Sequence, residues 1–211
     1  MITDACIYAP ESSSFPLSDF VTTANSCGYA RIVAVGAPSG ATHPYVLRGT
    51  LIFGRTGRAF VDAVRKAPKG NVVIVEAGDN SFNRTAITTK GVHLLTGLAD
   101  LPKGGFDHIT AKMAAQHTVG LVIDLSKIID PKSRRSALSH YADILKFARK
   151  YHFPLVIASG ASAPPGQKNR AETAALTSLF GMEREETYAA LNALDGILHQ
   201  PATVEIVEVN E

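Results

Sequence analysis

Residues 106–125 read FDHITAKMAAQHTVGLVIDL, a complete helix-to-strand unit. Its small alanines predict a helix over residues 107–118 that is slim enough to pack closely. Gly120 is expected to stop this helix, and residues 121–125 are expected to form a buried strand. The apolar stripe of the helix is predicted to consist of Ile109, Met113 and Val119.

The same alternation of short apolar strands and helical segments continues through most of the chain. Strands are predicted at 5–9, 31–36, 50–53, 72–76, 94–98, 121–125, 155–159 and 204–209. Helices are predicted at 17–26, 59–66, 83–89, 107–118, 134–151, 170–180 and 185–198. Continuous apolar runs such as VVIV and LVIA are typical of parallel strands that are covered on both faces.

Seven or eight strand–helix units in 211 residues predict an α/β fold, a small irregular (β/α) TIM-like barrel. We expect a single domain over residues 1–211, with an acidic section from about residue 183. An open doubly wound sheet is the alternative. No G-x-G-x-x-G turn follows the first strand, which disfavours a dinucleotide-binding fold.

The composition is that of an ordinary globular protein, with 45% hydrophobic and 19% charged residues. No apolar run reaches the roughly 18 residues that a bilayer requires, and no leader-like segment opens the sequence, so a cytoplasmic location is expected. Cys6 and Cys27 fit reduced thiols better than a disulfide framework.

The charges are segregated along the chain, although the net charge is only +2. Residues 1–182 hold 20 Lys and Arg against 12 Asp and Glu, whereas residues 183–211 hold Arg184 against seven acids. Cations cluster at 48–70 and again at 127–170. Such clusters predict contacts with a polyanion; solvated helix faces are the alternative.

A metal-dependent phosphoesterase of a related barrel fold is the main enzymatic alternative. Its metal cluster would need His and carboxylate side chains that converge at strand ends. The first strand offers only Asp4, and the seven histidines form no H-x-H pair. Magnesium could still be held by Glu76, Asp79 or Asp124, but their spacing does not demand it. Neither Ser159 nor the cysteines lie in a nucleophile motif.

Two anion sites are predicted at the carboxyl ends of strands. The segment 76–87, EAGDNSFNRTAI, offers a helix N-cap at residues 79–81 and places Asn83 and Arg84 on the first helical turn. Arg84 would bind a phosphate there, or else form an ion pair with Asp79 or Glu76. In the same way, Lys168 and Arg170 follow the loop 159–167 and could meet a phosphate at the next helix start; a solvated loop that binds no ligand is the alternative.

Four segments, taken together and in order, resemble a known family: NSFNRTAI, FDHITAKMAAQHTVGLVIDLS, KFARKYHFPLVIASGA and NRAETAALTSLFGME. From about residue 4 to residue 182 the chain is similar to archaeal ribonuclease P protein component 3, the family of the thirty-kilodalton ribonuclease P subunit. The resemblance implies a barrel related to metal-dependent phosphoesterase barrels but without their metal ligands.

The resemblance also implies a protein subunit of the endonuclease that removes the 5′ leader from precursor tRNA. The RNA subunit would then carry out the cleavage with its own magnesium ions, while this chain would bind and stabilise ribonuclease P RNA and pair with protein component 2. No catalytic residue and no metal or cofactor bound by the protein are expected, nor any contact with a membrane. The acidic section from residue 183 suits a protein partner or solvent.

The resemblance carries Asn83, Arg84 and Lys112 as RNA-facing or rim residues, and Arg170 after the SGA loop. Two departures from the family pattern stand out: LLTGLADLP lacks the usual Ser-His-Pro, and the loop ASAPPGQKNRAET is looser than in the family. Together with the basic clusters, these positions give the candidate RNA-binding residues Arg55, Arg58, Asn83, Arg84, Lys112, Arg134, Arg135, Lys168 and Arg170.

Overall fold

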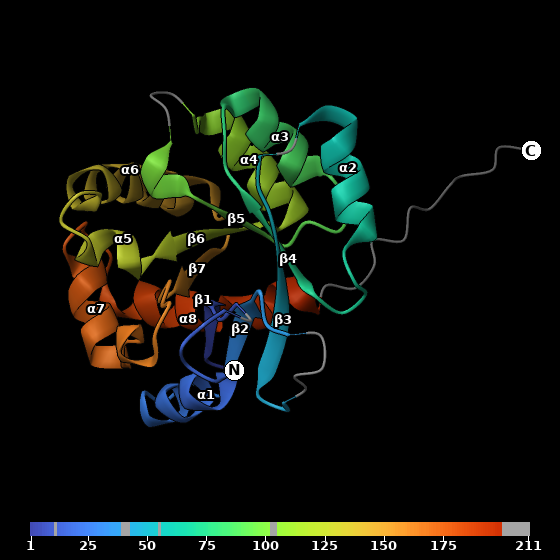
Figure 1. The fold of residues 1–211 in the computed structure, drawn as a ribbon. Helices are drawn as coiled ribbons and strands as arrows, with labels where there is room; N and C mark the ends of the chain where they lie inside the picture. Colours follow the sequence, from blue (N-terminus) through green and yellow to red (C-terminus); the bar gives the residue numbers. More distant parts are fainter. Residues whose placement is uncertain (11, 39–42, 55, 102–104, 200–211) are drawn as a thin grey trace, which may run out of the picture.

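Seven parallel strands form one sheet in the order β1-β2-β3-β4-β5-β6-β7 (Figure 1). This computed structural model describes residues 1–10, 12–38, 43–54, 56–101 and 105–199. The apolar runs of the sequence become strands because a parallel sheet is buried on both faces. The strands are β1 (Thr3–Tyr8), β2 (Arg31–Val35), β3 (Val46–Ile52), β4 (Val72–Glu76), β5 (Leu94–Thr96), β6 (Gly120–Asp124) and β7 (Leu155–Ala158).

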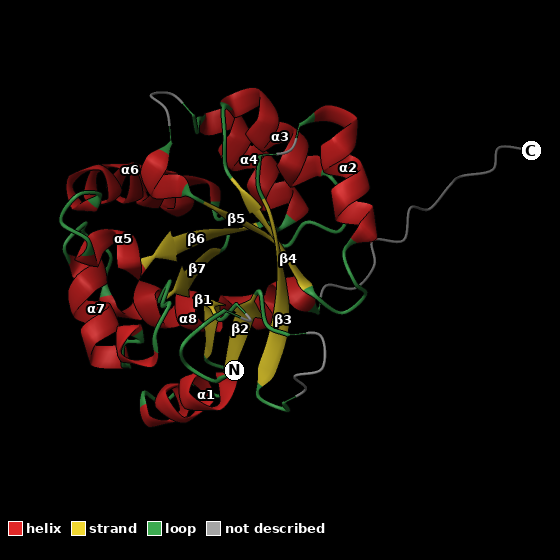
Figure 2. Cartoon of the chain, viewed as in Figure 1, coloured by secondary structure: helices red, strands yellow, loops and turns green. Residues whose placement is uncertain are grey.

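The sheet nearly closes on itself at a seam between β7 and β1. Gly160 N donates to Cys6 O at 3.1 Å and Tyr8 N donates to Ala161 O at 2.8 Å, just beyond the end of β7. A parallel bridge between Ile7 and Ala161 continues the same contact. The strands thus enclose a barrel with helices on its outside, which confirms the predicted TIM-like fold (Figure 2).

Helices α1, α2, α3, α4 and α6 each run back from the carboxyl end of the barrel toward the amino end of the next strand. None of the described helices is long and apolar enough to cross a membrane. Two short 3-10 segments, η1 (Leu98–Asp100) and η2 (Pro164–Gly166), lie in loops. The helices are α1 (Leu17–Ser26), α2 (Gly57–Lys66), α3 (Asn80–Thr88), α4 (His108–His117), α5 (Leu125–Ile129), α6 (Arg134–Tyr151), α7 (Arg170–Ser178) and α8 (Arg184–Leu198).

A bulge in β1 decides which of its side chains enter the barrel. The register with β2 shifts between Asp4 and Ile7, so Ala5 and Cys6 both join the apolar cluster inside the barrel. Ile7 turns outward and packs under the helices. Asp4, which precedes the bulge, lies on the outer side, level with Ile32.

Helix α8 covers the amino-terminal end of the barrel. Its Leu194 and Ile197 join the interior cluster, and its Asp195 binds both Arg31 of β2 and the amino terminus of the chain. Gly120 is required at this contact, because a Cβ there would lie 2.6 Å from Ile197 Cδ1. The buried side chains of α8, among them Leu191, Leu194 and Ile197, therefore belong to the core.

The opening segment, residues 106–125, departs from its prediction in two respects. Helix α4 ends at His117 with Thr118 in the left-handed region, so Gly120 does not stop the helix but begins β6. The buried face of α4 is also narrower than expected, since Ile109 is 43% exposed. The chain buries three small residues against the sheet instead: Thr110, Ala111 and Ala114.

Other elements confirm the sequence prediction closely, with small differences at their ends. The strand at 72–76 and the helices at 17–26 and 134–151 have the predicted bounds. Helix α5 was not predicted, because its first residue, Leu125, continues the apolar run of β6. The strand predicted at 204–209 lies outside the described residues.

Candidate nucleic-acid interface

The carboxyl-terminal mouth of the barrel, where barrels of this kind usually carry their reactive groups, holds Cys6, Glu76 and Asp124 at or near strand ends. Asp124 accepts hydrogen bonds from Ser126 N at 2.9 Å and Ser126 Oγ at 2.6 Å, and so caps α5. Burial raises the pKa of Asp124. Burial, and then the charges of Asp124 and Asp4, raise the pKa of Cys6 to about 12, which keeps it a thiol at neutral pH.

These mouth residues do not fit the metal centre of a phosphoesterase barrel. Within the described ranges, no three His, Cys, Asp or Glu side chains come close enough to hold a metal ion together. A catalytic zinc or a two-metal centre takes at least three such ligands. The buried carboxylates of the mouth serve turns and caps instead.

Asn83 holds two loops of the mouth together. Its Oδ1 accepts from Gly78 N at 2.8 Å, and its Nδ2 donates to Gly78 O at 2.9 Å and to Gly105 O at 2.7 Å. The side chain is fully buried. Asp79, one of the three predicted caps, accepts from Phe82 N at 2.8 Å and begins α3. A direct contact between Asn83 and RNA would require this turn to open.

Arg84 lies on the second turn of α3 rather than the first, and its ion-pair partner is neither Asp79 nor Glu76. Its Nη2 donates to Asp107 Oδ2 at 2.6 Å, because α3 packs side by side with α4 and Asp107 is the N-cap of α4. Burial opposes ionisation of Asp107, but hydrogen bonds from Thr110 and Arg84 lower its pKa. The pair leaves Arg84 about one-third exposed, at the rim.

Of four other cations predicted to bind RNA, Arg55, Arg58, Arg134 and Arg135, the three that the structure describes differ in the contacts that they make. Arg134 donates to Ile128 O at 2.8 Å and to Ile129 O at 2.7 Å, so it caps α5; Arg134 and Arg135 are both exposed. Arg58 is 94% exposed and lies 3.9 Å from Asp62. Arg55 lies outside the described residues.

Lys168 and Arg170 do not converge on one anion site at the start of α7. Asn169 and Glu172 form a capping box there, which satisfies the first N–H groups of the helix. Lys168 Nζ donates to Pro165 O at 3.2 Å. The Arg170 guanidinium lies 4.7 Å from the centre of the Tyr188 ring on α8.

Lys112 is exposed on α4 and faces the end of α6. Its Nζ lies 6.0 Å from the centre of the Tyr151 ring, and Lys150 Nζ lies 5.4 Å from the same ring. Lys150 and Tyr151 were not among the residues predicted from the sequence. The only signal for them was the basic run KFARKYH at the end of a predicted helix.

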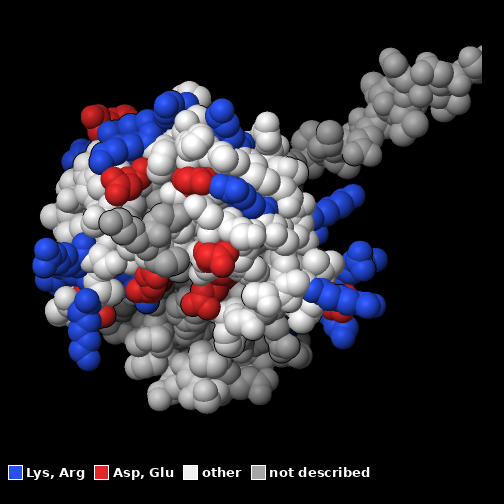
Figure 3. All heavy atoms as spheres, turned by 90° about the horizontal axis from the view of Figure 1, so that it is seen from above, with Lys and Arg blue, Asp and Glu red and all other residues white. Residues whose placement is uncertain are grey.

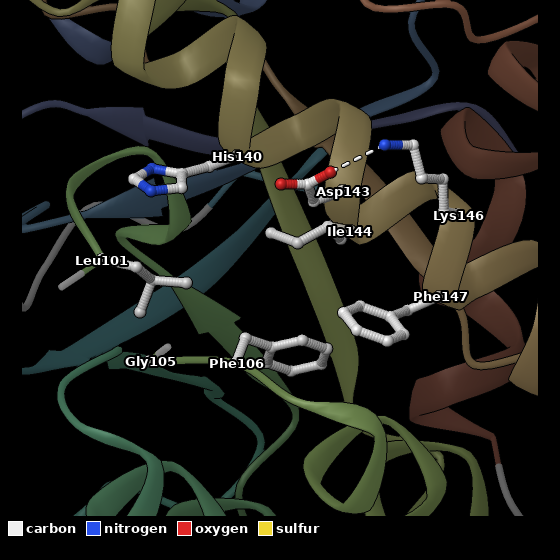
Figure 4. A pocket seen from close by; sticks show the side chains of 8 residues that line it. All are labelled: Leu101, Gly105, Phe106, His140, Asp143, Ile144, Lys146 and Phe147. Carbon is white, nitrogen blue, oxygen red and sulfur yellow. Dashed lines mark hydrogen bonds and ion pairs between the residues drawn. The ribbon is translucent and has the colours of Figure 1, made fainter. Parts of the chain in front are cut away.

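A cavity of about 290 Å³ lies between α6 and the segment that precedes α4. Phe106 and Phe147 line it with their ring centres 6.1 Å apart. His140, Asp143 and Lys146 line it from α6, the helix that also carries Phe147 (Figure 4). Asp143 and Lys146 bind each other at 2.8 Å, and His140 Nδ1 bonds Ala99 O at 2.9 Å. The polar groups of this pocket are thus engaged.

Positive and negative side chains are unevenly distributed on the surface. Figure 3 shows several Asp and Glu side chains toward the middle of the visible face, with most Lys and Arg side chains toward its margin. Two mouth cations are neutralised, since Arg84 pairs with Asp107 and Lys127 pairs with Asp100 at 2.7 Å. The mouth is therefore a poor site for a polyanion.

The sequence matches that of known proteins over most of its length. The model of a family described as RNase P subunit p30 matches residues 50–201. Ribonuclease P protein component 3 of Methanococcoides burtonii is 35% identical over 127 residues, which is 59% of this chain and 52% of that protein. The matched region spans about 52% to 62% of the length of the curated relatives.

Solved structures share the fold. A chain in a cryo-EM structure of archaeal ribonuclease P with mature tRNA aligns with a TM-score of 0.74 and 19% identity, covering 98% of this chain and 100% of that one. Histidinol phosphate phosphatase from Lactococcus lactis, solved with zinc, L-histidinol and phosphate, aligns with a TM-score of 0.53 and 10% identity, covering 93% of both chains. At these identities the likeness concerns the barrel alone.

Proposed function

The chain belongs to the RNase P subunit p30 family, and from that premise we propose that it is a protein subunit of ribonuclease P, the ribonucleoprotein that removes the 5′ leader from precursor tRNA. The family match over residues 50–201 is the observation that carries this proposal. The likeness of the barrel to a chain of archaeal ribonuclease P over nearly the full length of both supports it.

In this role the chain binds and stabilises the ribonuclease P RNA, which carries out the cleavage with its own magnesium ions. Two features favour such a supporting role. The described mouth residues form no metal centre, and burial keeps the Cys6 thiol protonated. The surface nevertheless carries many exposed Lys and Arg side chains for phosphate contacts. Precursor tRNA is contacted through the holoenzyme, and protein component 2 is the proposed protein partner.

Reconstitution of precursor-tRNA cleavage tests this function. Archaeal ribonuclease P RNA and the other protein components are assayed with and without this chain, at limiting magnesium. We expect faster cleavage when the chain is present, because it stabilises the active RNA fold. Equal rates with and without the chain would contradict the proposal. So would stoichiometric divalent metal and chelator-sensitive phosphatase activity in the purified protein alone, which are the properties of the phosphoesterase alternative.

A further inference from the structure

Exposed cations gather at the amino-terminal end of the barrel, opposite the mouth. In a (β/α) barrel the end of each helix and the turn into the next strand lie at this end. Five exposed cations lie there, and a sixth, Lys112, faces Tyr151 at this end from the middle of α4; none of the six has a carboxylate partner among the described residues. This amino-edge cluster consists of Arg65, Lys66, Lys69, Lys90, Lys112 and Lys150.

Backbone hydrogen bonds make this end one continuous surface. His93 N donates to Val73 O at 3.0 Å, and Gly120 N donates in turn to His93 O at 3.0 Å. Leu121 N donates to Pro154 O at 2.9 Å. The turns into β4, β5, β6 and β7 therefore lie side by side, and the ends of α2, α3, α4 and α6 follow one another around the barrel (Figure 1).

The segments that build this surface lack acidic residues. Residues 63–75, 85–99, 108–123 and 144–171 contain no Asp or Glu. The surface ends where α6 meets α8, since Arg149 of α6 binds Glu186 of α8 at 2.7 Å. The exposed cations thus form a positively charged band across the ends of α2, α3, α4 and α6. The band ends at the acidic helix α8.

The amino-edge cluster has an aromatic side chain at one end. The Tyr151 ring, on the last residue of α6, is shared by Lys112 from α4 and Lys150 from α6. Two lysines beside a half-exposed tyrosine provide both charge and a hydrogen-bonding hydroxyl for a sugar–phosphate backbone. The ring also holds the two ammonium groups near each other without neutralising them.

Helix dipoles alone do not explain this distribution. Cations are favoured in the last turn of a helix, which accounts for Arg65, Lys66 and Lys150. Lys69 and Lys90, however, lie beyond the helix ends, in turns. Lys112 lies in the middle of α4. What Lys69, Lys90 and Lys112 have in common with the other three cations is that all of them lie on the amino-edge surface.

We propose that the amino-edge cluster is the surface through which this chain binds RNA, so that the RNA backbone follows the ends of α2, α3, α4 and α6. The inference rests on the proposed function, in which the chain binds ribonuclease P RNA. It places the RNA at the amino-terminal end of the barrel. Most of the cations predicted from the sequence belong instead to the mouth, at the opposite end. Exposed lysines on the surface of a folded barrel suit recognition of RNA by shape and phosphates.

Two full-length variants with the same net charge test the placement. The amino-edge variant carries Lys66→Gln, Lys69→Gln, Lys90→Gln, Lys112→Gln and Lys150→Gln. The rival variant carries Arg58→Gln, Lys132→Gln, Arg135→Gln, Lys168→Gln and Arg170→Gln. Affinity for an in vitro transcribed archaeal ribonuclease P RNA is measured for both variants and the unchanged chain. We expect the amino-edge variant to lose at least about tenfold in affinity and the rival variant to lose clearly less.

The outcomes separate this inference from the proposed function. If the unchanged chain neither binds the RNA nor affects reconstituted cleavage, the proposed function fails and the inference fails with it. If the unchanged chain binds but the rival variant loses as much affinity as the amino-edge variant, or more, the placement is wrong and the function stands. Unchanged RNA affinity together with lost binding to a protein partner would assign the surface to that partner instead.

A lysine footprint of the unchanged chain keeps the inference testable if the five substitutions disturb folding. The chain is acetylated at lysine with and without the same RNA, and the modified positions are identified by mass spectrometry. Protection of Lys66, Lys69, Lys90, Lys112 and Lys150 is the expected result. Protection of Lys127, Lys132 and Lys168 in their place would overturn the inference.

Discussion

The two ends of the barrel are built by the same seven strands but use their charged residues differently. At the carboxyl-terminal mouth, Asp124 is buried and caps α5, and Asp107 binds Arg84, whereas Glu76 is exposed. At the amino-terminal edge, lysines such as Lys90 and Lys112 are exposed and unpaired in the described part of the chain. Enzymes of this fold work at the mouth. Here the mouth residues serve the fold, so the position of a residue in a barrel does not by itself assign function.

The comparison predicts that a change in the packed mouth costs far more stability than a change at the amino-terminal edge. The largest effect is expected for Gly160→Ala. Gly160 has a φ of +63°, and an added Cβ would overlap Asp124 Oδ1 and lie 2.6 Å from Ser126 Oγ. Strain and overlap together should lower the free energy of unfolding by about 3 kcal/mol or more, measured by urea denaturation.

Gly54→Ala is the matched control for this prediction. Gly54 also has a positive φ, of +60°, but a Cβ there would meet no atom of the described residues within 4 Å. Only the backbone strain remains, so the expected loss is about 1–2 kcal/mol. Equal losses for the two variants would show that the packing around Asp124 does not hold the mouth together.

A smaller effect of opposite sign is expected for Asp4→Asn at the seam beside the mouth. Asp4 is fully buried; its Oδ1 accepts from Ser159 N at 2.8 Å, and its Oδ2 has no partner among the described residues. Burial raises its pKa to about 6. Since the folded pKa is the higher one, the carboxyl's contribution to stability is complete below about pH 3.8 and is lost as the pH rises through about 6.

Asp4→Asn should therefore stabilise the protein at pH 7, by about 2–3 kcal/mol, and have little effect near pH 3.5. Urea denaturation at the two pH values measures the difference. Asp19→Asn, at an exposed position on α1, is the control and should change stability by no more than about 0.5 kcal/mol at either pH. A destabilised Asp4→Asn protein at pH 7 would mean that the buried charge is compensated.

The smallest stability effect is expected for the rim pair. Arg84 and Asp107 are about one-third exposed, so solvent screens them, and Arg84→Ala should cost only about 0.5–1 kcal/mol. A double-mutant cycle with Asp107→Ala measures their coupling. The same Arg84→Ala chain should support reconstituted cleavage almost as well as the unchanged chain. A large loss of cleavage with normal stability would indicate that RNA binds at the mouth.

The sequence predicted features that depend on local patterns. The apolar run at 72–76 and the periodicity of 134–151 suffice for a buried strand and a surface helix. In the apolar stripe predicted for α4, Val119 is buried and Met113 packs against the core, but Ile109 was wrong, because close packing against the sheet favoured Thr110 and Ala114. The bulge that turns Ile7 outward is a matter of register between strands, which one strand's sequence does not contain.

The candidate site was predictable only in part, for a related reason. A cluster of cations can be read from a sequence, but its ion-pair partners cannot. Arg84 meets Asp107, 23 positions away, because α3 packs against α4. Lys112 and Lys150 meet at Tyr151 across two helices. Because strands and helices alternate, successive loops lie at opposite ends of the barrel. Cations that are neighbours in the sequence therefore lie on different surfaces.

The salt dependence of RNA binding tests the central contrast most directly. Each lysine that contacts a phosphate should contribute about one unit to the slope of log affinity against log salt concentration. We predict that the slope for the amino-edge variant is shallower by about three to five units than that of the unchanged chain, and that the slope for the rival variant changes by about one unit or less. Equal slopes for the unchanged chain and the amino-edge variant, with a shallower slope for the rival variant, would contradict the account.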